Sequence, residues 1–374
     1  MSSFGNGSTY HIHDTVTVVY MSEPGIDIII PVWNRPVETR DCLVNLVKHS
    51  PEARLVLLNN GSDRETESLL EEFAEALDER ALLISTQVNL GFVRAINRGL
   101  ARVEADFAAV VRSTSQVTAG WLEPLLTLVR TRREAGVIVP RIVQGPVKRG
   151  AHGPAPSPVL ITETSCGDFA AMLIRKELYD RIGGFDEGMD GGLWCLKDFS
   201  RRALRSGFLT LAAEGSPVYY RDPPPLGSPA RREENLLRSI AACNAQWGEE
   251  RSYCVHFPKG ADIATVRRSF DVMLTGARQG HSFTVLVPSG TFLELVASGC
   301  ERHHRNIRLE KLPRLFSAGR IKRIFSLLRS ATPRLVSVSG IEGIPFPGDD
   351  GSIAFPELER QVNATAVEKY SSVI

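Results

Sequence analysis

The chain has 374 residues, 43% of them hydrophobic and 23% charged, so it is long enough for two domains and can bury a core. Its formal net charge of +1 points to no charged partner, its first residues lack the pattern of a signal peptide, so none is expected, and no apolar run reaches the roughly 18 residues that span a bilayer. Its six cysteines form no C-x-x-C pair, which indicates reduced thiols in a cytoplasmic protein rather than a disulfide framework or a zinc site.

Strands and helices alternate in the pattern of the first 130 residues. A strand at 15–20 precedes a continuous apolar run at 26–32, which is typical of a strand buried on both faces. Pro36 suits the first turn of the next helix, and Ser62 with Glu65 fits a capping box that opens another. Further strands are predicted at 54–58, 82–85 and 107–111, and further helical stripes at 42–47, 69–77, 92–100 and 121–128. This rhythm predicts a doubly wound, mainly parallel α/β sheet.

The rest of the chain divides at loops rich in glycine and proline. Such loops are predicted at 144–160 and 183–192, and a linker at 221–235, where prolines and charges gather. Between and after these loops, strands are predicted at 169–174, 252–257, 282–287 and 334–338, and helices at 197–206, 263–277, 292–297 and 315–328. We therefore expect an N-terminal extension (1–25), an α/β domain (26–220), a linker (221–250), a smaller C-terminal α/β unit (251–348) and a tail (349–374).

Five short stretches of the first domain carry a recognisable pattern. They read IDIIIPVWNRP, VLLNNGSDRET, NLGFVRAINRGL, VTAGWLEPL and IGGFDE, and they follow one another in this order between residues 26 and 187. Together they resemble the family 2 glycosyltransferases, and the third is close to a motif of the rhamnosyltransferase-like branch. The resemblance implies the GT-A fold of nucleotide-diphospho-sugar transferases over 26–220, and transfer of a sugar from a nucleotide-sugar donor in polysaccharide biosynthesis.

The same resemblance places the donor at the carboxyl ends of the first strands, where ligands of doubly wound sheets lie. It implies that Trp33 and Asn34 line the base pocket, and that Asn59 stands where the family has an aspartate. The sequence Asn-Asn-Gly-Ser also fits a simple turn, and Gly91 and Asn97 fit helix packing as well as donor contact. The predicted donor-binding residues are Pro31, Trp33, Asn34, Asn59, Gly61, Asn89, Gly91, Asn97, Arg112, Ser113 and Thr114.

The metal ligands of the family are missing from their expected position. The family holds Mg²⁺ or Mn²⁺ on an acidic triplet before the Gly-Trp-Leu turn, and counting back from Gly120 places Arg112, Ser113 and Thr114 there. A guanidinium repels a divalent cation that wants carboxylate oxygens. We therefore predict no metal cofactor. Arg112 either pairs with the donor diphosphate or is a solvated arginine in a site that has lost its function.

The family's catalytic base is also missing. Alignment on Gly207 places Cys195 and Leu196 at the Glu-Asp pair that carries the base. Asp198, at a position that is more often structural, and Asp190, in the glycine-rich loop, are the substitutes that the sequence offers. An acidic residue near a helix start also serves as a partner of the helix dipole. The resemblance further implies that Asp186 and Glu187 shape the acceptor side.

A basic segment lies in the C-terminal unit. Residues 318–331 place apolar side chains on one helical face and arginines and lysines beside it. Such a helix fits peripheral contact with the inner face of an anionic membrane, but an ordinary surface helix whose apolar stripe packs on the sheet fits better. Interleaved aromatics and a nucleic-acid-binding motif are absent from the sequence, so nucleic acid is not an expected partner.

Two functions fit these patterns. The first is an active, metal-independent glycosyltransferase whose acceptor is a glycan, a lipid or a small molecule. The alternative is a non-catalytic relative that binds sugar nucleotides or acts as a scaffold in a polysaccharide pathway. A nucleotidyltransferase is disfavoured, because residues 31–36 contain no glycine where that class has a glycine-rich turn.

Overall fold

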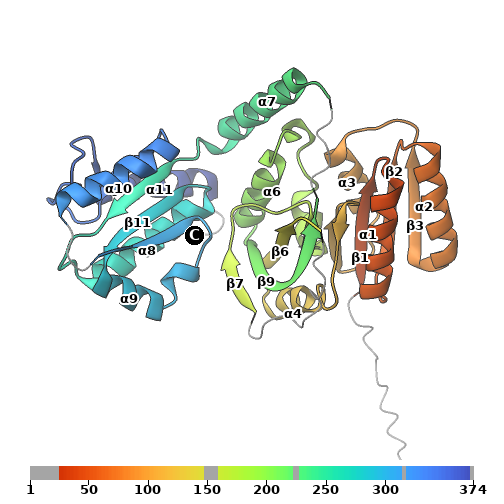
Figure 1. Cartoon of the computed structure of the whole chain (residues 1–374), viewed down its shortest axis with the longest axis horizontal. Helices are drawn as coiled ribbons and strands as arrows, with labels where there is room; N and C mark the ends of the chain where they lie inside the picture. The colour runs from red at the N-terminus through yellow and green to blue at the C-terminus, as the bar shows by residue number, and fades with distance from the viewer. Residues whose placement is uncertain (1–24, 147–158, 222–226, 314–316, 371–374) are drawn as a thin grey trace, which may run out of the picture.

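The computed structural model describes residues 25–146, 159–221, 227–313 and 317–370. It contains two α/β units, one from each half of the chain, and a long helix between them (Figure 1). The strand predicted at 15–20 lies outside the described residues. No helix in the described part of the chain is long and apolar enough to span a membrane.

The N-terminal unit is built on a nine-stranded mixed sheet, which confirms the predicted fold class. Its strand order is β3-β2-β1-β4-β8-β6-β9-β5, with β7 paired to β9. The first four strands of this order are parallel, whereas β8 runs antiparallel to both β4 and β6. The bounds are β1 (Ile26–Val32), β2 (Arg54–Asn60), β3 (Ala81–Thr86), β4 (Phe107–Val111), β5 (Ser115–Gln116), β6 (Ala135–Gln144), β7 (Leu160–Glu163), β8 (Ala171–Arg175) and β9 (Leu209–Tyr220).

Helices cover both faces of this sheet because its central strands are apolar throughout. All seven residues of β1 are buried. Ile28 and Ile30 belong to the core on one face, and Ile29 belongs to the core on the other. The covering helices are α1 (Pro36–His49), α2 (Arg64–Leu77), α3 (Phe92–Leu100), α4 (Glu123–Thr131), α5 (Lys176–Ile182) and α6 (Trp194–Arg205).

The helix start predicted at Ser62 is one residue early. The cap of α2 is Asp63, whose carboxylate accepts a hydrogen bond from the Thr66 backbone N–H at 2.9 Å. Ser62 has another task, since its hydroxyl accepts a hydrogen bond from the Asn34 backbone N–H at 3.0 Å. The capping box is therefore replaced by a contact that ties the ends of β1 and β2 together.

The linker predicted at 221–250 contains a 19-residue helix, α7 (Pro229–Trp247). Ser228 caps it, Pro229 stands in its first turn, and Gly248 ends it at a φ of 84°. Its C-terminal half is buried in the N-terminal unit, where Cys243 and Trp247 join the hydrophobic core. This segment is part of the folded N-terminal unit, so the predicted boundary at residue 220 moves to the end of α7.

The C-terminal unit is a five-stranded parallel sheet in the order β12-β11-β10-β13-β14. The segment predicted as a tail belongs to it, because Leu358 and Val362 of its last helix are fully buried in its core. The bounds are β10 (Ser252–His256), α8 (Ile263–Arg278), β11 (Ser282–Pro288), α9 (Ser289–Ala297), β12 (Ile307–Leu312), α10 (Ala318–Ala331), β13 (Val336–Ser339), β14 (Ile353–Ala354) and α11 (Phe355–Tyr370).

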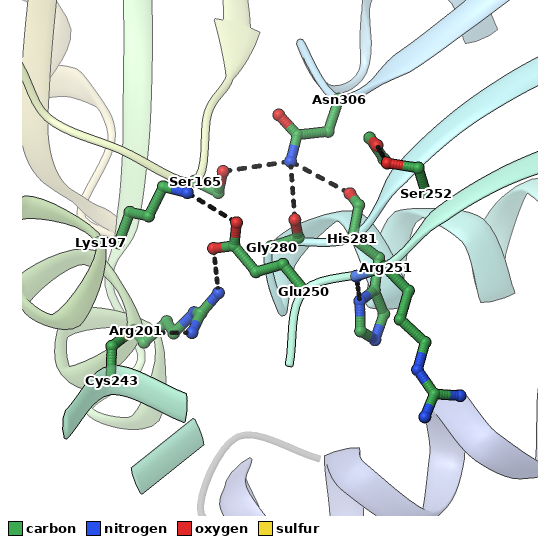
Figure 2. A network of polar contacts seen from close by, with 11 residues as sticks. Ser165, Lys197, Arg201, Cys243, Glu250, Arg251, Ser252, Gly280, His281 and Asn306 are labelled. Carbon is green, nitrogen blue, oxygen red and sulfur yellow. Dashed lines mark hydrogen bonds and ion pairs between the residues drawn. The ribbon is translucent and has the colours of Figure 1, made fainter. Parts of the chain in front are cut away.

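A network of polar contacts joins the two units (Figure 2). Glu250 follows α7 and accepts hydrogen bonds from Lys197 at 2.6 Å and from Arg201 at 2.5 Å, both on α6. Nearby, the Asn306 amide donates to the Ser165 hydroxyl across the same interface at 3.2 Å. Arg201 is 1% exposed, so this ion pair lies largely out of water.

The edge strand β7 extends the connection between the units. Glu163, its last residue, forms an isolated parallel bridge with His304. The carboxylate of Glu163 also binds Arg278 of α8 with two bonds of 2.7 Å each. Two parallel charge-assisted bonds add orientation as well as energy, and together with the backbone bridge they fix how the C-terminal unit is docked.

Candidate functional site

The strand order of the N-terminal sheet reverses between β1 and β4. From β1 the chain proceeds to β2 and β3 on one side, and β4 then pairs with the other side of β1. A crevice forms at the carboxyl ends of parallel strands at such a reversal. Here a cavity of about 410 Å³ opens beside this point, lined by Pro31, Val32, Trp33, Asn60, Asn89, Gly91, Phe92, Asp190, Gly191, Gly192, Arg232 and Asn235.

The turn after β2 presents Asn60 to the crevice and turns Asn59 inward. Asn59 is 2% exposed, and its Oδ1 accepts a hydrogen bond from the Ser62 backbone N–H at 3.0 Å. Asn60 lines the cavity and donates to Asn89 Oδ1 at 3.0 Å. Gly61 permits the turn, because its φ is 69° and an added Cβ would lie 2.5 Å from the Val88 carbonyl carbon. Asn59 and Gly61 therefore act as residues of a simple turn.

The turn after β1 divides its residues in a similar way. Pro31 and Trp33 line the cavity, and their predicted contact with the donor stays a prediction. Asn34 does not, since its Oδ1 accepts a hydrogen bond from the Asp63 backbone N–H at 2.7 Å. Its φ of 57° is a left-handed conformation that asparagine tolerates. Asn34 therefore fixes the two strand-end turns to each other, with Trp33 left at the cavity wall.

The start of α3 contributes Asn89 and Gly91 to the cavity, but Asn97 lies elsewhere. The Asn97 side chain accepts from the Phe185 backbone N–H and donates to the Phe185 carbonyl, each at 2.8 Å. It also donates to Glu187 at 3.2 Å. Asn97 therefore has a packing role, because it holds the Gly-Gly-Phe-Asp-Glu loop. Gly91, in contrast, lines the cavity.

The two candidate carboxylates have different surroundings. Asp190 lies at the solvent-accessible rim of the cavity, where desolvation by neighbouring protein atoms raises the pKa of its carboxyl above the usual value. Asp198 is fully buried and accepts hydrogen bonds from Trp247 Nε1 at 3.0 Å and from Arg202 Nε at 2.7 Å. Asp198 is therefore a structural residue of the core. The predicted catalytic role then falls on Asp190 alone, and it stays a prediction.

The position of the family's base is part of the hydrophobic core. Cys195 and Leu196, in the first turn of α6, are 0% and 1% exposed. Burial raises the pKa of the Cys195 thiol to about 12, so it stays protonated and unreactive at neutral pH. Neither side chain is among those that line the cavity.

Arg112 directly follows β4, on the other side of the reversal point. Its guanidinium carbon lies 4.3 Å from the centre of the Phe92 ring, and its Nη1 donates to the Tyr220 hydroxyl at 2.8 Å. Phe92 lines the cavity, so the Arg112 guanidinium lies against a residue of the cavity wall. Ser113 and Thr114 are buried and do not line the cavity.

The residues at this position do not fit a divalent cation. The described part of the chain has no group of three or more histidine, cysteine, aspartate or glutamate side chains placed to hold a metal ion. At the end of β4 the protein offers a guanidinium and two hydroxyl groups instead of carboxylates. At the end of β4 the charge is therefore positive and belongs to the Arg112 side chain.

The sequence patterns missed the wall that α7 supplies. Arg232 and Asn235 line the cavity from that helix, although they follow β1 by about 200 residues. The Ser-Pro start and the glycine at the end of α7 are ordinary helix signals that could have revealed the helix. The contact of α7 with the cavity has no local signal, because it depends on packing.

Comparisons with known proteins give a consistent assignment. Residues 27–182 match the family model described as glycosyl transferase family 2. An uncharacterized glycosyltransferase of Haemophilus influenzae is 27% identical over 105 residues, which cover 28% of this chain and 32% of that one. Polypeptide N-acetylgalactosaminyltransferase 13 of Rattus norvegicus is 27% identical over 127 residues, which cover 32% of this chain and 23% of that one.

The likeness in structure lies in the fold. The crystal structure of GalNAc-T7 with UDP, GalNAc and Mn²⁺ superposes with a TM-score of 0.50 at 16% identity, covering 60% of this chain and 49% of that one. These matches span about half or less of the relatives' own length. The family-model match, residues 27–182, includes β1, β2 and β4, whose carboxyl ends lie at the cavity.

Proposed function

We propose that the protein transfers a sugar from a nucleotide-sugar donor to a glycan, lipid or small-molecule acceptor, because residues 27–182 match the model of glycosyl transferase family 2. The observation that carries the proposal is the open cavity at the strand-order reversal, with Trp33 in its wall and the Arg112 cation beside it. Ligands of doubly wound sheets bind at this place.

The donor is bound without a divalent cation in this proposal. Trp33 and Pro31 offer an apolar surface to the nucleoside base, and Asn60 and Asn89 offer amide groups for polar contact. Arg112 offers a planar guanidinium that matches the geometry of phosphate oxygens. The rings of Phe92 and Tyr220 hold that guanidinium in place, so the side chain loses little conformational entropy when it binds an anion.

Asp190 is the general base of the proposed reaction. Its carboxylate takes the proton from an acceptor hydroxyl, and the hydroxyl oxygen forms a bond to the anomeric carbon of the donor. The bond from that carbon to the diphosphate breaks, and the nucleoside diphosphate leaves with the electron pair. A base is most effective when its pKa lies near the working pH, and partial desolvation shifts the pKa of Asp190 in that direction.

The alternative proposal is a non-catalytic sugar-nucleotide-binding or scaffold protein of a polysaccharide pathway. The observation in its favour is the burial of Asn59, Cys195 and Leu196, which stand where the resemblance implies functional acidic residues. Such a protein would bind donors in the same cavity and turn over none of them.

A cytoplasmic location remains a prediction, which the six free cysteines support. Contact of α10 with the inner face of a membrane has less support. Ile321 and Phe325 of its apolar stripe are buried against the C-terminal sheet, so a lipid surface would meet mainly the basic side chains.

A turnover assay separates the two proposals. The purified chain is incubated with each common nucleoside diphosphate sugar in EDTA or in Mn²⁺, with a mixture of glycan and lipid-linked acceptors, and release of nucleoside diphosphate is measured. We expect release with one donor class at similar rates in EDTA and Mn²⁺. Binding of a donor with no release under any condition would instead support the non-catalytic protein.

A further inference from the structure

The helix α7 forms one wall of the cavity and is held there tightly. The Ser239 hydroxyl in the middle of the helix accepts a hydrogen bond from the Gly191 backbone N–H at 2.9 Å. An added Cβ on Gly191 would lie 2.5 Å from the Asn235 carbonyl oxygen, so the loop and the helix backbone are in direct contact. The position of the N-terminal half of α7 over the cavity is therefore fixed by packing.

Arg232 projects from this half of α7 to the cavity wall. Its Nη1 donates to the Gly227 carbonyl oxygen at 2.6 Å, which uses one of the five N–H groups of a guanidinium. Among the residues that the structure describes, no carboxylate lies within ion-pair distance of it. The cavity thus has an arginine on its wall whose charge is not neutralised by a described neighbour.

The far end of the same helix is anchored in the N-terminal core. Trp247 donates from Nε1 to the buried carboxylate of Asp198 at 3.0 Å. Cys243 accepts a long contact of 3.6 Å from Arg201, which joins the contacts between the two units (Figure 2). An arginine on a helix anchored in this way is preorganised, so binding a ligand costs little conformational entropy.

We propose that Arg232 is a second cation for the donor diphosphate, acting from α7 in addition to Arg112; this inference rests on the proposed function. Arg232 lines the cavity from the helix between the units, whereas Arg112 is not a lining residue and lies against Phe92, which is part of the cavity wall. Two guanidinium groups supply the positive charge and the planar donors that phosphate oxygens require. The inter-unit helix is then part of the donor site.

Calorimetric titration tests this role. The full chain is titrated in EDTA with UDP, GDP, CDP, ADP and thymidine diphosphate, and with the monophosphate of whichever nucleotide binds most tightly. We expect the Arg232→Ala chain to bind that diphosphate about tenfold more weakly than the unchanged chain, because a charge-assisted hydrogen bond is lost. Binding of the monophosphate should change less, and Arg232→Lys should lie between the two.

Arg231 provides the matched control. It is exposed on the same turn of α7 and does not line the cavity, so Arg231→Ala should leave the affinity within about twofold, with the thermal unfolding curve checking the fold of each variant. Equal affinity of the Arg232→Ala and unchanged chains, or equal weakening by both alanine variants, would overturn the role of Arg232. Failure of the unchanged chain to bind any nucleotide would remove the proposed function itself.

Discussion

The two sheets of the molecule reverse their strand order in the same way, but they differ at the point of reversal. A cavity lies beside this point in the N-terminal sheet, whereas a buried side chain fills it in the C-terminal sheet. In the N-terminal sheet, Trp33 after β1 and Arg112 after β4 flank the reversal point, with a cavity of about 410 Å³ beside it. In the C-terminal sheet the reversal lies between β10 and β13, and Phe257 fills it at 0% exposure. A Cβ on Gly340 after β13 would lie 2.5 Å from the Phe257 ring.

The hollow at the C-terminal sheet's edge lies over other strand ends. It has a volume of about 580 Å³ and is lined by Lys259, Pro288, Ser289, Gly290, Leu293, Lys311 and Pro313, none of which follows β13. The comparison teaches that a doubly wound sheet offers a place for a ligand without guaranteeing a site. The N-terminal sheet has a cavity because the loop at 190–192 and helix α7 form walls around an unfilled reversal point.

The largest effect is expected from removal of the proposed base at the open reversal. Asp190→Asn should lower the transfer rate by about 100- to 10,000-fold, since an amide cannot take the acceptor proton. Donor affinity, measured by calorimetry, should stay within a few fold. Transfer at the unchanged rate by this variant would show that Asp190 is not the base.

The same carboxylate predicts the direction of the pH dependence. Desolvation raises its pKa above the ordinary value of an aspartate, so the base form is lost at a higher pH than for an exposed aspartate. The transfer rate should therefore rise with pH through this raised pKa, and the rate of Asp190→Asn should lack that rise. A rate profile that is the same for both chains would contradict the assignment.

Removal of the ring that fills the reversal point of the C-terminal sheet should have an effect of similar size, but on stability rather than on activity. Phe257→Ala should lower the free energy of unfolding of the C-terminal unit by about 3–5 kcal/mol, because a buried ring is replaced by a cavity. Urea unfolding with hydrogen exchange at β10 and β13 would measure it, and Phe257→Leu should lose less. The donor affinity should not change, and a large change would mean that the two reversals are coupled.

A smaller loss of stability is expected at the contact between the units. Glu250→Gln leaves the guanidinium of Arg201, which is 1% exposed, without its carboxylate. Glu250 is partly exposed, so we expect a loss of about 2 kcal/mol in urea unfolding. The exposed neighbour Glu249 provides the control, since Glu249→Gln should change little. Equal stability of the two variants would show that the pair contributes nothing.

The smallest effect is expected at the wall of the open cavity. Trp33→Ala should weaken nucleotide binding by about 1–2 kcal/mol, because base stacking on an aromatic ring is lost. Val37, which is 69% exposed at the start of α1, is the matched control, and Val37→Ala should bind as the unchanged chain does. An unaltered affinity of Trp33→Ala would place the base elsewhere in the cavity.

Local patterns predicted the sheet better than the site. The apolar runs of β1, β2 and β4 are visible in sequence because buried parallel strands are apolar on both faces. Which of two adjacent amides faces the cavity is not visible, since it depends on the left-handed turn at Gly61, beside which Asn60 lines the cavity and Asn59 does not. Arg232 could not be placed at all, because its contact with the cavity comes from packing of α7 on the loop at 190–192.

The central claim is that the cavity at the strand-order reversal of the N-terminal sheet binds a donor through arginine side chains and without a metal ion. Calorimetric titration of the unchanged chain with nucleoside diphosphate sugars, once in EDTA and once in Mn²⁺, tests this claim. We expect one donor class to bind one molecule per chain with dissociation constants that agree within about twofold between the two solutions. Binding that occurs in Mn²⁺ and disappears in EDTA, or no binding in either solution, would contradict a donor site built on arginines.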